Sequence, residues 1–212
     1  MIMAFEVKSH LLNTPVSAER FEKLSTILSS LGLRSSLHLL HVKHSNNFQS
    51  YHNYQHMISV ALFCYDAAEH YSLTGYDTRM LILAALYHDL DHSGHNDTTD
   101  VVNVARSIVN ADRILRIVEP DLDDNVLKII SKLILVTENT HLVSASTRLE
   151  MILVDADILQ ATSLDGKQWI QGLNDEQDAK HTGASTRAFL RGRIKTEWAR
   201  EKISRFDFAS LD

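Results

Sequence analysis

Apolar residues recur along most of the chain at the three- and four-residue spacing of amphipathic helices. Near the start, Phe21, Leu24 and Leu28 would lie on one side of a helix that begins near Ser17 and ends at Gly32. No segment convincingly alternates apolar and polar residues, as a half-buried strand would. The same pattern predicts further helices over 35–44, from 51–54 to the turn at 75, and over 77–90, 97–110, 123–138, 146–161 and 185–206.

These elements predict an all-α fold. The 7 glycines and 2 prolines support it, because the many tight turns of an all-β fold need more of both. Residues 165–183 show no clear helical pattern, so we expect an irregular or loosely helical segment there. Since repeats and linkers are absent from the 212 residues, a single compact helical bundle over 1–212 is the simplest prediction.

Composition narrows the function classes. A net charge of −6 argues against binding of a nucleic-acid backbone, which needs a basic surface. An anionic small substrate stays possible, because bound metal ions would reverse the local charge. Cys64 is the one cysteine, so no internal disulfide can form. We see no secretory signal and no apolar run of about 20 residues, so we expect a cytoplasmic protein without a membrane partner.

The segment 77–90 carries the strongest chemical signal. Residues 80–86 are almost entirely apolar, which predicts a buried helix, and its end runs into His88, Asp89, Asp91 and His92. Imidazoles and carboxylates on a buried helix are unfavourable unless something pairs with them. A metal ion would satisfy them together.

Two further pairs could complete such a site. His52 and His56 are four residues apart, so on a helix they would share a face and either bind one metal or divide binding and catalysis. Asp155 and Asp157 are two apart on a later predicted helix and face nearly opposite ways. Only one of these two carboxylates is expected to reach the site.

The order His56, His88-Asp89, Asp157 resembles the signature of the HD superfamily of metal-dependent phosphohydrolases. YHNYQH at 51–56 and HDLDHSGHN at 88–96 resemble the metal-site motifs of the cyclic nucleotide phosphodiesterases in that superfamily. LILVTENTH at 133–141 and VDADILQAT at 154–162 look like the motifs that follow. The resemblance implies an HD-domain-like helical bundle, and its ADIL segment places the last ligand at Asp157 rather than Asp155.

The resemblance also assigns roles. His56, His88, Asp89 and Asp157 would bind the first of two divalent ions, with Asp89 bridging to the second. His52 would protonate the leaving oxygen, and His92 and Asp91 would lie near the water between the ions. The remaining candidates for the surroundings of the metal or the substrate are Asn96, Asp155 and His141. Imidazole ligands suit Fe, Zn, Co or Mn at the first position, and a carboxylate with waters suits Mg or Mn at the second.

We therefore expect hydrolysis of a nucleotide phosphate ester, with a cyclic nucleotide phosphodiester preferred. One feature departs from that group, which uses a glutamine three residues before a phenylalanine to hold the base. None of Gln160, Gln168, Gln171 and Gln177 stands at that spacing. Nucleoside monophosphates, pyrophosphates or alarmones are alternative substrates, and a non-catalytic metal-containing nucleotide-binding regulatory domain is the alternative class. His52 favours an enzyme, because a purely structural metal site needs no acid beside it.

Overall fold

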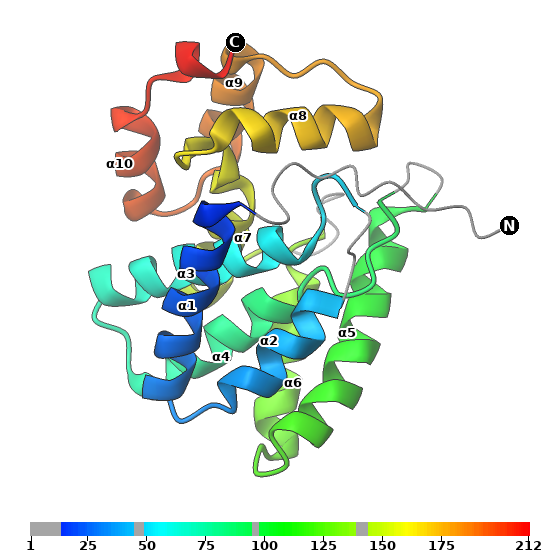
Figure 1. Cartoon of the computed structure of the whole chain (residues 1–212). Helices are drawn as coiled ribbons and strands as arrows, with labels where there is room; N and C mark the ends of the chain where they lie inside the picture. Colours follow the sequence, from blue (N-terminus) through cyan, green and yellow to red (C-terminus); the bar gives the residue numbers. More distant parts are fainter. Residues whose placement is uncertain (1–13, 45–48, 95–97, 139–143) are drawn as a thin grey trace, which may run out of the picture.

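The computed structural model describes residues 14–44, 49–94, 98–138 and 144–212, and throughout these ranges the regular secondary structure is helical (Figure 1). The all-α prediction is confirmed. The helices are α1 Pro15–Ser30, α2 Ser35–His44, α3 Tyr54–His70, α4 Gly75–Tyr87, α5 Asp100–Val118, α6 Asp124–Leu135, α7 Arg148–Ile158, η1 Leu159–Thr162, α8 Gly166–Gln177, α9 Gly183–Arg193, α10 Glu197–Arg205 and η2 Phe208–Leu211.

Helices α3 and α4 form the centre of the main core. They pack against each other, with α1, α2 and α7 against α3 and α6 against α4. As the apolar run predicts, α4 is covered on every side, and the residues from Met80 to Tyr87 are all buried. This burial fixes the end of α4, and with it His88 and Asp89, in the interior.

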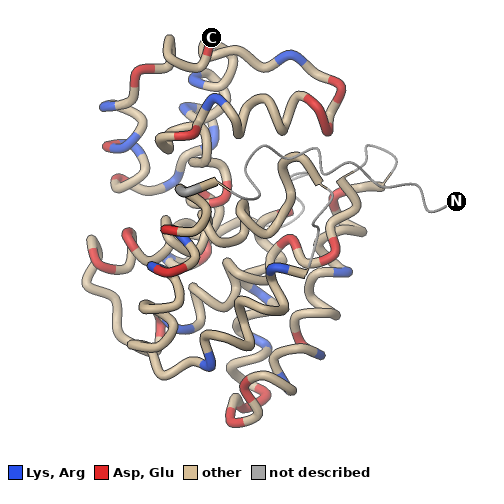
Figure 2. The backbone as a smooth tube through the Cα atoms, viewed as in Figure 1, with Lys and Arg blue, Asp and Glu red and all other residues tan. Residues whose placement is uncertain are grey.

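A second, smaller apolar cluster lies among the C-terminal helices, which Figure 1 shows above the rest of the bundle. Ile170 from α8, Leu190 from α9 and Phe208 from η2 meet there. Acidic and basic residues are interspersed along much of the described backbone (Figure 2). In the part of the chain that the structure describes, no helix has both the length and the apolar character to cross a membrane.

The start of α3 differs from the sequence expectation in a way that matters for the site. Asn53 caps this helix, and its side chain accepts hydrogen bonds from the backbone N–H groups of Gln55 and His56. His52 therefore precedes the helix, and its expected place on one helical face with His56 is wrong. The centroids of their rings are still only 5.8 Å apart.

The C-terminal region contains two further corrections. Residues 166–177 form a regular helix, α8, where we expected an irregular or loosely helical segment. The long helix expected over 185–206 is divided into α9 and α10, because Ile194 is extended and Thr196 caps the second helix. The division is held by Asp155, whose carboxylate accepts hydrogen bonds from the backbone of Lys195 and Thr196 at 2.8 and 2.7 Å.

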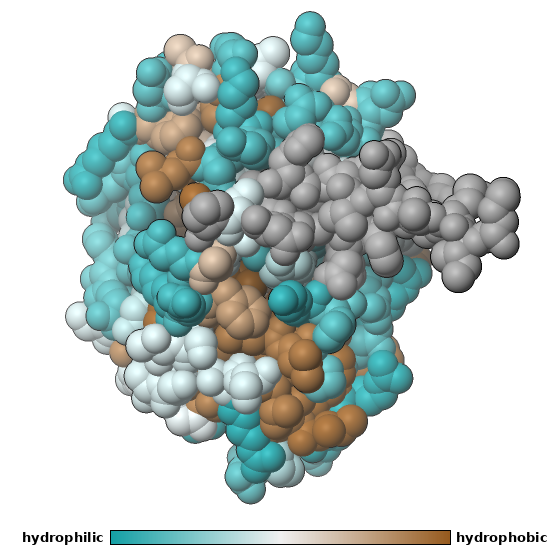
Figure 3. Space-filling view, viewed as in Figure 1, coloured by the Kyte–Doolittle hydropathy of each residue, from teal (hydrophilic) through white to brown (hydrophobic). Residues whose placement is uncertain are grey.

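Part of the surface shown in Figure 3 is apolar, and the hydrophobic residues, in brown, gather in the lower part of the view. Helices α2 and α5 both contribute exposed apolar side chains. The larger ones are Leu37, Leu40, Val101, Val102, Val109 and Ile117.

Candidate active site and metal centre

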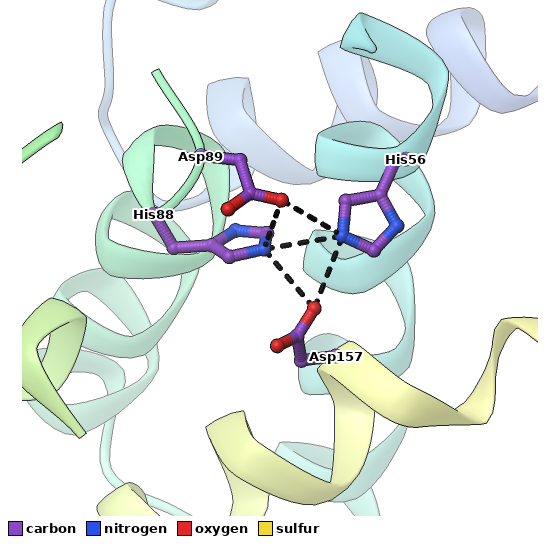
Figure 4. A group of neighbouring side chains, drawn as sticks. All are labelled: His56, His88, Asp89 and Asp157. Carbon is purple, nitrogen blue, oxygen red and sulfur yellow. Dashed lines mark hydrogen bonds and ion pairs between the residues drawn. The ribbon is translucent and has the colours of Figure 1, made fainter. Parts of the chain in front are cut away.

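Four side chains from three parts of the bundle converge on one point: His56 from α3, His88 and Asp89 from the end of α4, and Asp157 from α7 (Figure 4). The Nε2 atoms of His56 and His88 are 3.2 Å apart. Asp89 Oδ2 lies 3.1 Å from each of these nitrogens. Asp157 Oδ1 lies 3.0 Å from His56 Nε2 and 3.2 Å from His88 Nε2.

These separations fit a shared divalent cation. Two ligand atoms bound about 2.1 Å from one ion lie about 3.0–3.4 Å apart at right or tetrahedral angles. The five distances given above fall between 3.0 and 3.2 Å, and the four ligand atoms all lie within 4.8 Å of one another. Two imidazole nitrogens and two carboxylate oxygens are a donor set that first-row divalent ions accept readily. The cluster can therefore bind a divalent metal.

The tautomer of His88 suits coordination. Its Nδ1 lies 2.8 Å from the carbonyl oxygen of Ala85, which can only accept, so Nδ1 carries the hydrogen. The lone pair of Nε2 is then directed into the cluster. Metal-binding histidines are commonly oriented in this way, by a hydrogen bond from the ring nitrogen that does not bind the metal.

The cluster also has the electrostatics of a cation site. Burial alone would lower the pKa of His88, but the charges of Asp89 and Asp157 outweigh it and raise this pKa well above its ordinary value. Burial alone would raise the pKa of Asp89, yet the charge of His88 and hydrogen bonds from both imidazoles hold it well below. Burial would also raise the pKa of Asp157, but the charge of His88 and hydrogen bonds from both imidazoles lower it. Both carboxylates are therefore charged at neutral pH, and a metal ion would replace the proton on the imidazole.

His52 lies beside this cluster and is held by Glu176 of α8. Glu176 Oε2 is 2.5 Å from His52 Nδ1, and Oε1 accepts hydrogen bonds from the backbone N–H groups of Tyr51 and His52. Burial alone would lower the pKa of His52, but the hydrogen bond with Glu176 and the charge of Asp89 outweigh it and raise the pKa to about 9. His52 is therefore a cation at neutral pH.

A glycine brings Glu176 to this position. Gly172 lies one helical turn before Glu176, on the same face of α8. A Cβ atom at Gly172 would come within 2.5 Å of the carbonyl oxygen of Ser50. The missing side chain lets α8 approach the segment that carries Tyr51 and His52.

His92 reaches the site, whereas Asp91 faces α5. The ring of His92 stacks on that of His52, with centroids 3.8 Å apart and planes at 18°. Burial and the charge of His52 lower the pKa of His92 to about 4, so it is neutral at pH 7. Asp91 is exposed, and its carboxylate accepts a hydrogen bond from Asn110 at 2.6 Å.

The other expected neighbours of the site are placed elsewhere or are not described. The Asp155 carboxylate is turned to the start of α10, where it also accepts a hydrogen bond from the Thr196 hydroxyl at 2.7 Å. Its structural contacts leave Asp157 as the α7 carboxylate in the cluster. Asn96 and His141 lie outside the described residues.

A cavity of about 350 Å³ opens beside the cluster, between α7, α8 and α9. His52 and Asp157 lie in its wall, so the cavity borders the metal cluster. Gln177, His181 and Arg193 add polar groups to the lining. Its apolar lining consists mainly of Ile158, Trp169, Ile170, Leu173, Phe189 and Leu190.

Three residues of the site were missed by sequence reasoning: Glu176, Gly172 and Thr186. The first two lie in the segment that we expected to be irregular. Thr186 lines the cavity and stands three residues before Phe189, the spacing at which the resembled phosphodiesterases carry glutamine. A glycine within a polar helical segment was the one local signal available, since such a glycine often marks a close approach.

The fold and the site together define an all-helical protein built around a buried His/Asp cluster that can bind a divalent metal. The model of the HD domain family matches residues 53–162, which is more than half of the chain. The chain belongs to the HD domain family, and the prediction of an HD-superfamily metal-dependent phosphohydrolase is confirmed. The matched residues run from the cap of α3 to the end of η1 and include all four members of the cluster.

A solved structure extends the likeness beyond this segment. The chain is similar to the phosphodiesterase domain of the RhoPDE fusion protein from the choanoflagellate Salpingoeca rosetta, with a TM-score of 0.62 and 16% identity. The alignment covers 94% of this chain and 83% of that one. At this identity the likeness establishes a shared fold, which includes the C-terminal helices. No curated protein sequence matches the chain significantly.

Proposed function

We propose that the protein hydrolyses a phosphate ester of a nucleotide, with a cyclic nucleotide phosphodiester as the preferred substrate. The observation that carries this proposal is a cationic His52, held by Glu176, beside a four-ligand metal cluster at the wall of a cavity. The phosphodiesterase domain that shares the fold supports the preference for a diester.

His56, His88, Asp89 and Asp157 would hold the first ion, for which Fe, Mn, Zn or Co are the candidates. We propose a second position for Mg or Mn, with Asp89 as the shared ligand. When bound, such ions polarise the phosphoryl oxygens and make an attacking water more acidic.

His52 is proposed as the general acid. Glu176 occupies its Nδ1, so the proton on Nε2 is the one that can be given to the leaving oxygen. Cations at Asp89 and Asp157 would weaken the negative field that raises the pKa of His52. Its pKa would then move from about 9 towards neutrality, where a general acid is most effective.

The cavity would accept the organic part of the ester. Its volume of about 350 Å³ lies within the usual range for small-molecule sites, about 300–1,000 Å³. Its apolar walls suit a planar ring. Nucleoside monophosphates, pyrophosphates and alarmones are alternative substrates for the same centre.

The competing proposal is a regulatory domain that binds a nucleotide without hydrolysing it. The His52–Glu176 pair favours an enzyme, because the buried carboxylate of Glu176 keeps the partly buried imidazole of His52 charged. A structural metal site requires only the ligands.

The proposal is tested by turnover of metal-loaded protein. Protein supplied with Mn²⁺ should hydrolyse bis(p-nitrophenyl) phosphate and at least one member of a cyclic nucleotide panel. His52→Ala should reduce hydrolysis of the cyclic nucleotide by about 10²–10⁴-fold. It should affect the nitrophenyl ester far less, because nitrophenolate leaves without a proton. Absence of turnover on every ester by the metal-loaded wild type would contradict the proposal, and equal loss on both esters would contradict the role of His52.

A further inference from the structure

The two imidazoles of the metal cluster are held in different ways. His88 is oriented by the hydrogen bond from its Nδ1 to the carbonyl oxygen of Ala85. His56 is equally buried, but its Nδ1 has no hydrogen-bond partner among the described residues. Metal-binding histidines usually have such a partner, which fixes the ring and the nitrogen that faces the metal. For His56, this task falls to the packing around the ring.

Aromatic side chains provide this packing. The ring centroid of Tyr51 lies 4.8 Å from that of His56, with the planes at 39°. The centroid of Trp169 lies 6.0 Å from that of His56, with the planes at 67°, and the indole is fully buried. Tyr51 and Trp169 also meet edge to face, at 5.7 Å. Aromatic pairs at these separations attract each other in defined orientations, so the position of the indole helps to set that of the imidazole.

The indole of Trp169 is itself fixed by an ion pair that begins on α1. Its Nε1–H donates to Asp165 Oδ1 at 3.2 Å. Each carboxylate oxygen of Asp165 also accepts a hydrogen bond from the guanidinium of Arg20, at 2.5 and 2.6 Å. Burial alone would raise the pKa of Asp165, but the hydrogen bond and the charge of Arg20 outweigh it and lower the pKa. Because a bidentate pair allows little rotation, the carboxylate is held in the plane that the indole N–H needs.

We propose that Arg20 is a positioning residue for the metal ligand His56. It acts through Asp165, which holds the indole of Trp169 against the imidazole. These three supporting residues all lie outside the segment 53–162 that the family model matches. The inference rests on the metal centre of the proposed function, but it does not depend on turnover of any substrate.

Metal binding tests this role without substrate, through the affinity for Mn²⁺ and the visible absorption of bound Co²⁺. Arg20→Gln should weaken Mn²⁺ binding by about tenfold, the lower end of the effect of groups that orient metal ligands. Trp169→Phe keeps an aromatic ring but removes the indole N–H, and should weaken binding by a similar factor. The two changes together should weaken it by about tenfold rather than about a hundredfold, because both act on the same contact. The Co²⁺ bands should shift in each variant, since they report the coordination geometry.

Arg116→Gln and Trp198→Phe are the matched controls. Arg116 forms a bidentate pair with Asp112 within α5. Trp198 donates its indole N–H to Asp66, near the other end of α3 from His56. Both controls remove the same chemical groups as the test variants, and both should keep the wild-type affinity for Mn²⁺ and the wild-type Co²⁺ bands. Thermal unfolding would check that each variant is folded.

The inference is overturned if folded Arg20→Gln keeps the wild-type Mn²⁺ affinity and Co²⁺ bands, or if Arg116→Gln weakens binding equally. Should Arg20→Gln not fold, wild-type affinity in folded Trp169→Phe would overturn it in the same way. It is also overturned if the losses in the double variant multiply, or if the wild type binds no Mn²⁺. The expected pattern of metal binding without hydrolysis of any ester would instead refute the proposed function alone.

Discussion

The charge of His52 depends on a carboxylate more than a hundred positions further along the chain. Glu176 accepts the Nδ1 hydrogen and two backbone N–H groups, so it fixes both the orientation of the imidazole and its protonation. Because Glu176 and Asp89 raise the pKa of His52, the acid form persists to higher pH than in an isolated histidine.

Glu176→Gln tests this dependence. The amide can still accept from the backbone, but it has no charge, so the pKa of His52 falls. The protonated acid is then lost at a lower pH, and the alkaline limb of the rate profile for a cyclic nucleotide should shift to lower pH, with kcat about 10–100-fold lower at pH 8. Hydrolysis of bis(p-nitrophenyl) phosphate serves as the control that does not need the acid. An alkaline limb at the wild-type pH would show that Glu176 does not set the charge.

At the level of single residues, the sequence indicated the histidines and aspartates that lie together in the structure, but not the groups that hold His52 beside them. His56, His88, Asp89 and Asp157 stand in motifs that are short and local, and the structure brings them together. Glu176 is one of many helical glutamates, and only the packing of α8 on Ser50 and Tyr51 distinguishes it. Its role is set by tertiary contact, which a local pattern does not encode.

Two carboxylates near the end of helix α7 make different contacts. Asp157 points to the metal cluster, and Asp155, which is fully buried, holds the start of α10. Opposite faces of one helix thus join the metal centre to the C-terminal region.

The two variants Asp157→Ala and Asp155→Ala should therefore fail differently. Asp157→Ala removes a ligand, so elemental analysis should find metal content strongly reduced while the protein remains folded. Asp155→Ala should retain the metal but leave backbone N–H groups at Lys195 and Thr196 without their acceptor, which costs about 1–3 kcal/mol of unfolding free energy. Loss of metal in the Asp155 variant with retention in the Asp157 variant would overturn the ligand assignment.

Helix α8 should be displaced by a single methyl group. In Gly172→Ala the new Cβ would meet the Ser50 carbonyl at 2.5 Å, so α8 must move and carry Glu176 away from His52. We expect at least a tenfold loss of cyclic nucleotide hydrolysis, measured as kcat, with metal content unchanged. Gly192→Ala in α9 is the control, because its Cβ would meet nothing within 4 Å and alanine favours a helix. Equal activity in both variants would show that the close approach is not required.

The first seven α-helices could be predicted from the sequence, whereas the arrangement of the C-terminal helices could not. Of the first seven, α1, α3, α5 and α6 show apolar periodicity, α4 is a continuous apolar run, and residues such as Asn53 and Thr147 cap α3 and α7. The sequence of α8 is rich in polar residues and depends on a few apolar positions, such as Trp169 and Ile170, that are buried by other elements. The break between α9 and α10 is stabilised by Asp155, forty positions earlier, so helical propensity alone predicted one continuous helix.

For the molecule as a whole, the metal cluster joins helices that otherwise meet only through the core. Its ligands come from α3, the end of α4 and α7, and without a cation two carboxylates and two imidazoles are buried together. Metal that binds the folded chain preferentially must therefore stabilise it.

Thermal unfolding should report this coupling. Treatment with a chelator should lower Tm by about 5–10 °C relative to protein saturated with Mn²⁺, since binding at a hundredfold excess over Kd contributes about 2.7 kcal/mol. Asp157→Ala should show a much smaller difference between the two conditions. A wild-type Tm that does not respond to metal would mean that the cluster is not a binding site.

The position of Trp169 gives the protein an optical reporter of its own centre. Its indole is fully buried, 6.0 Å from the ring of His56 and 5.7 Å from that of Tyr51. The second tryptophan, Trp198, lies on α10 and donates to Asp66. Trp198→Phe would leave Trp169 as the single emitter, whose fluorescence should be quenched by Co²⁺ and much less by Mg²⁺. Occupancy of the centre could then be followed in real time, without any added label.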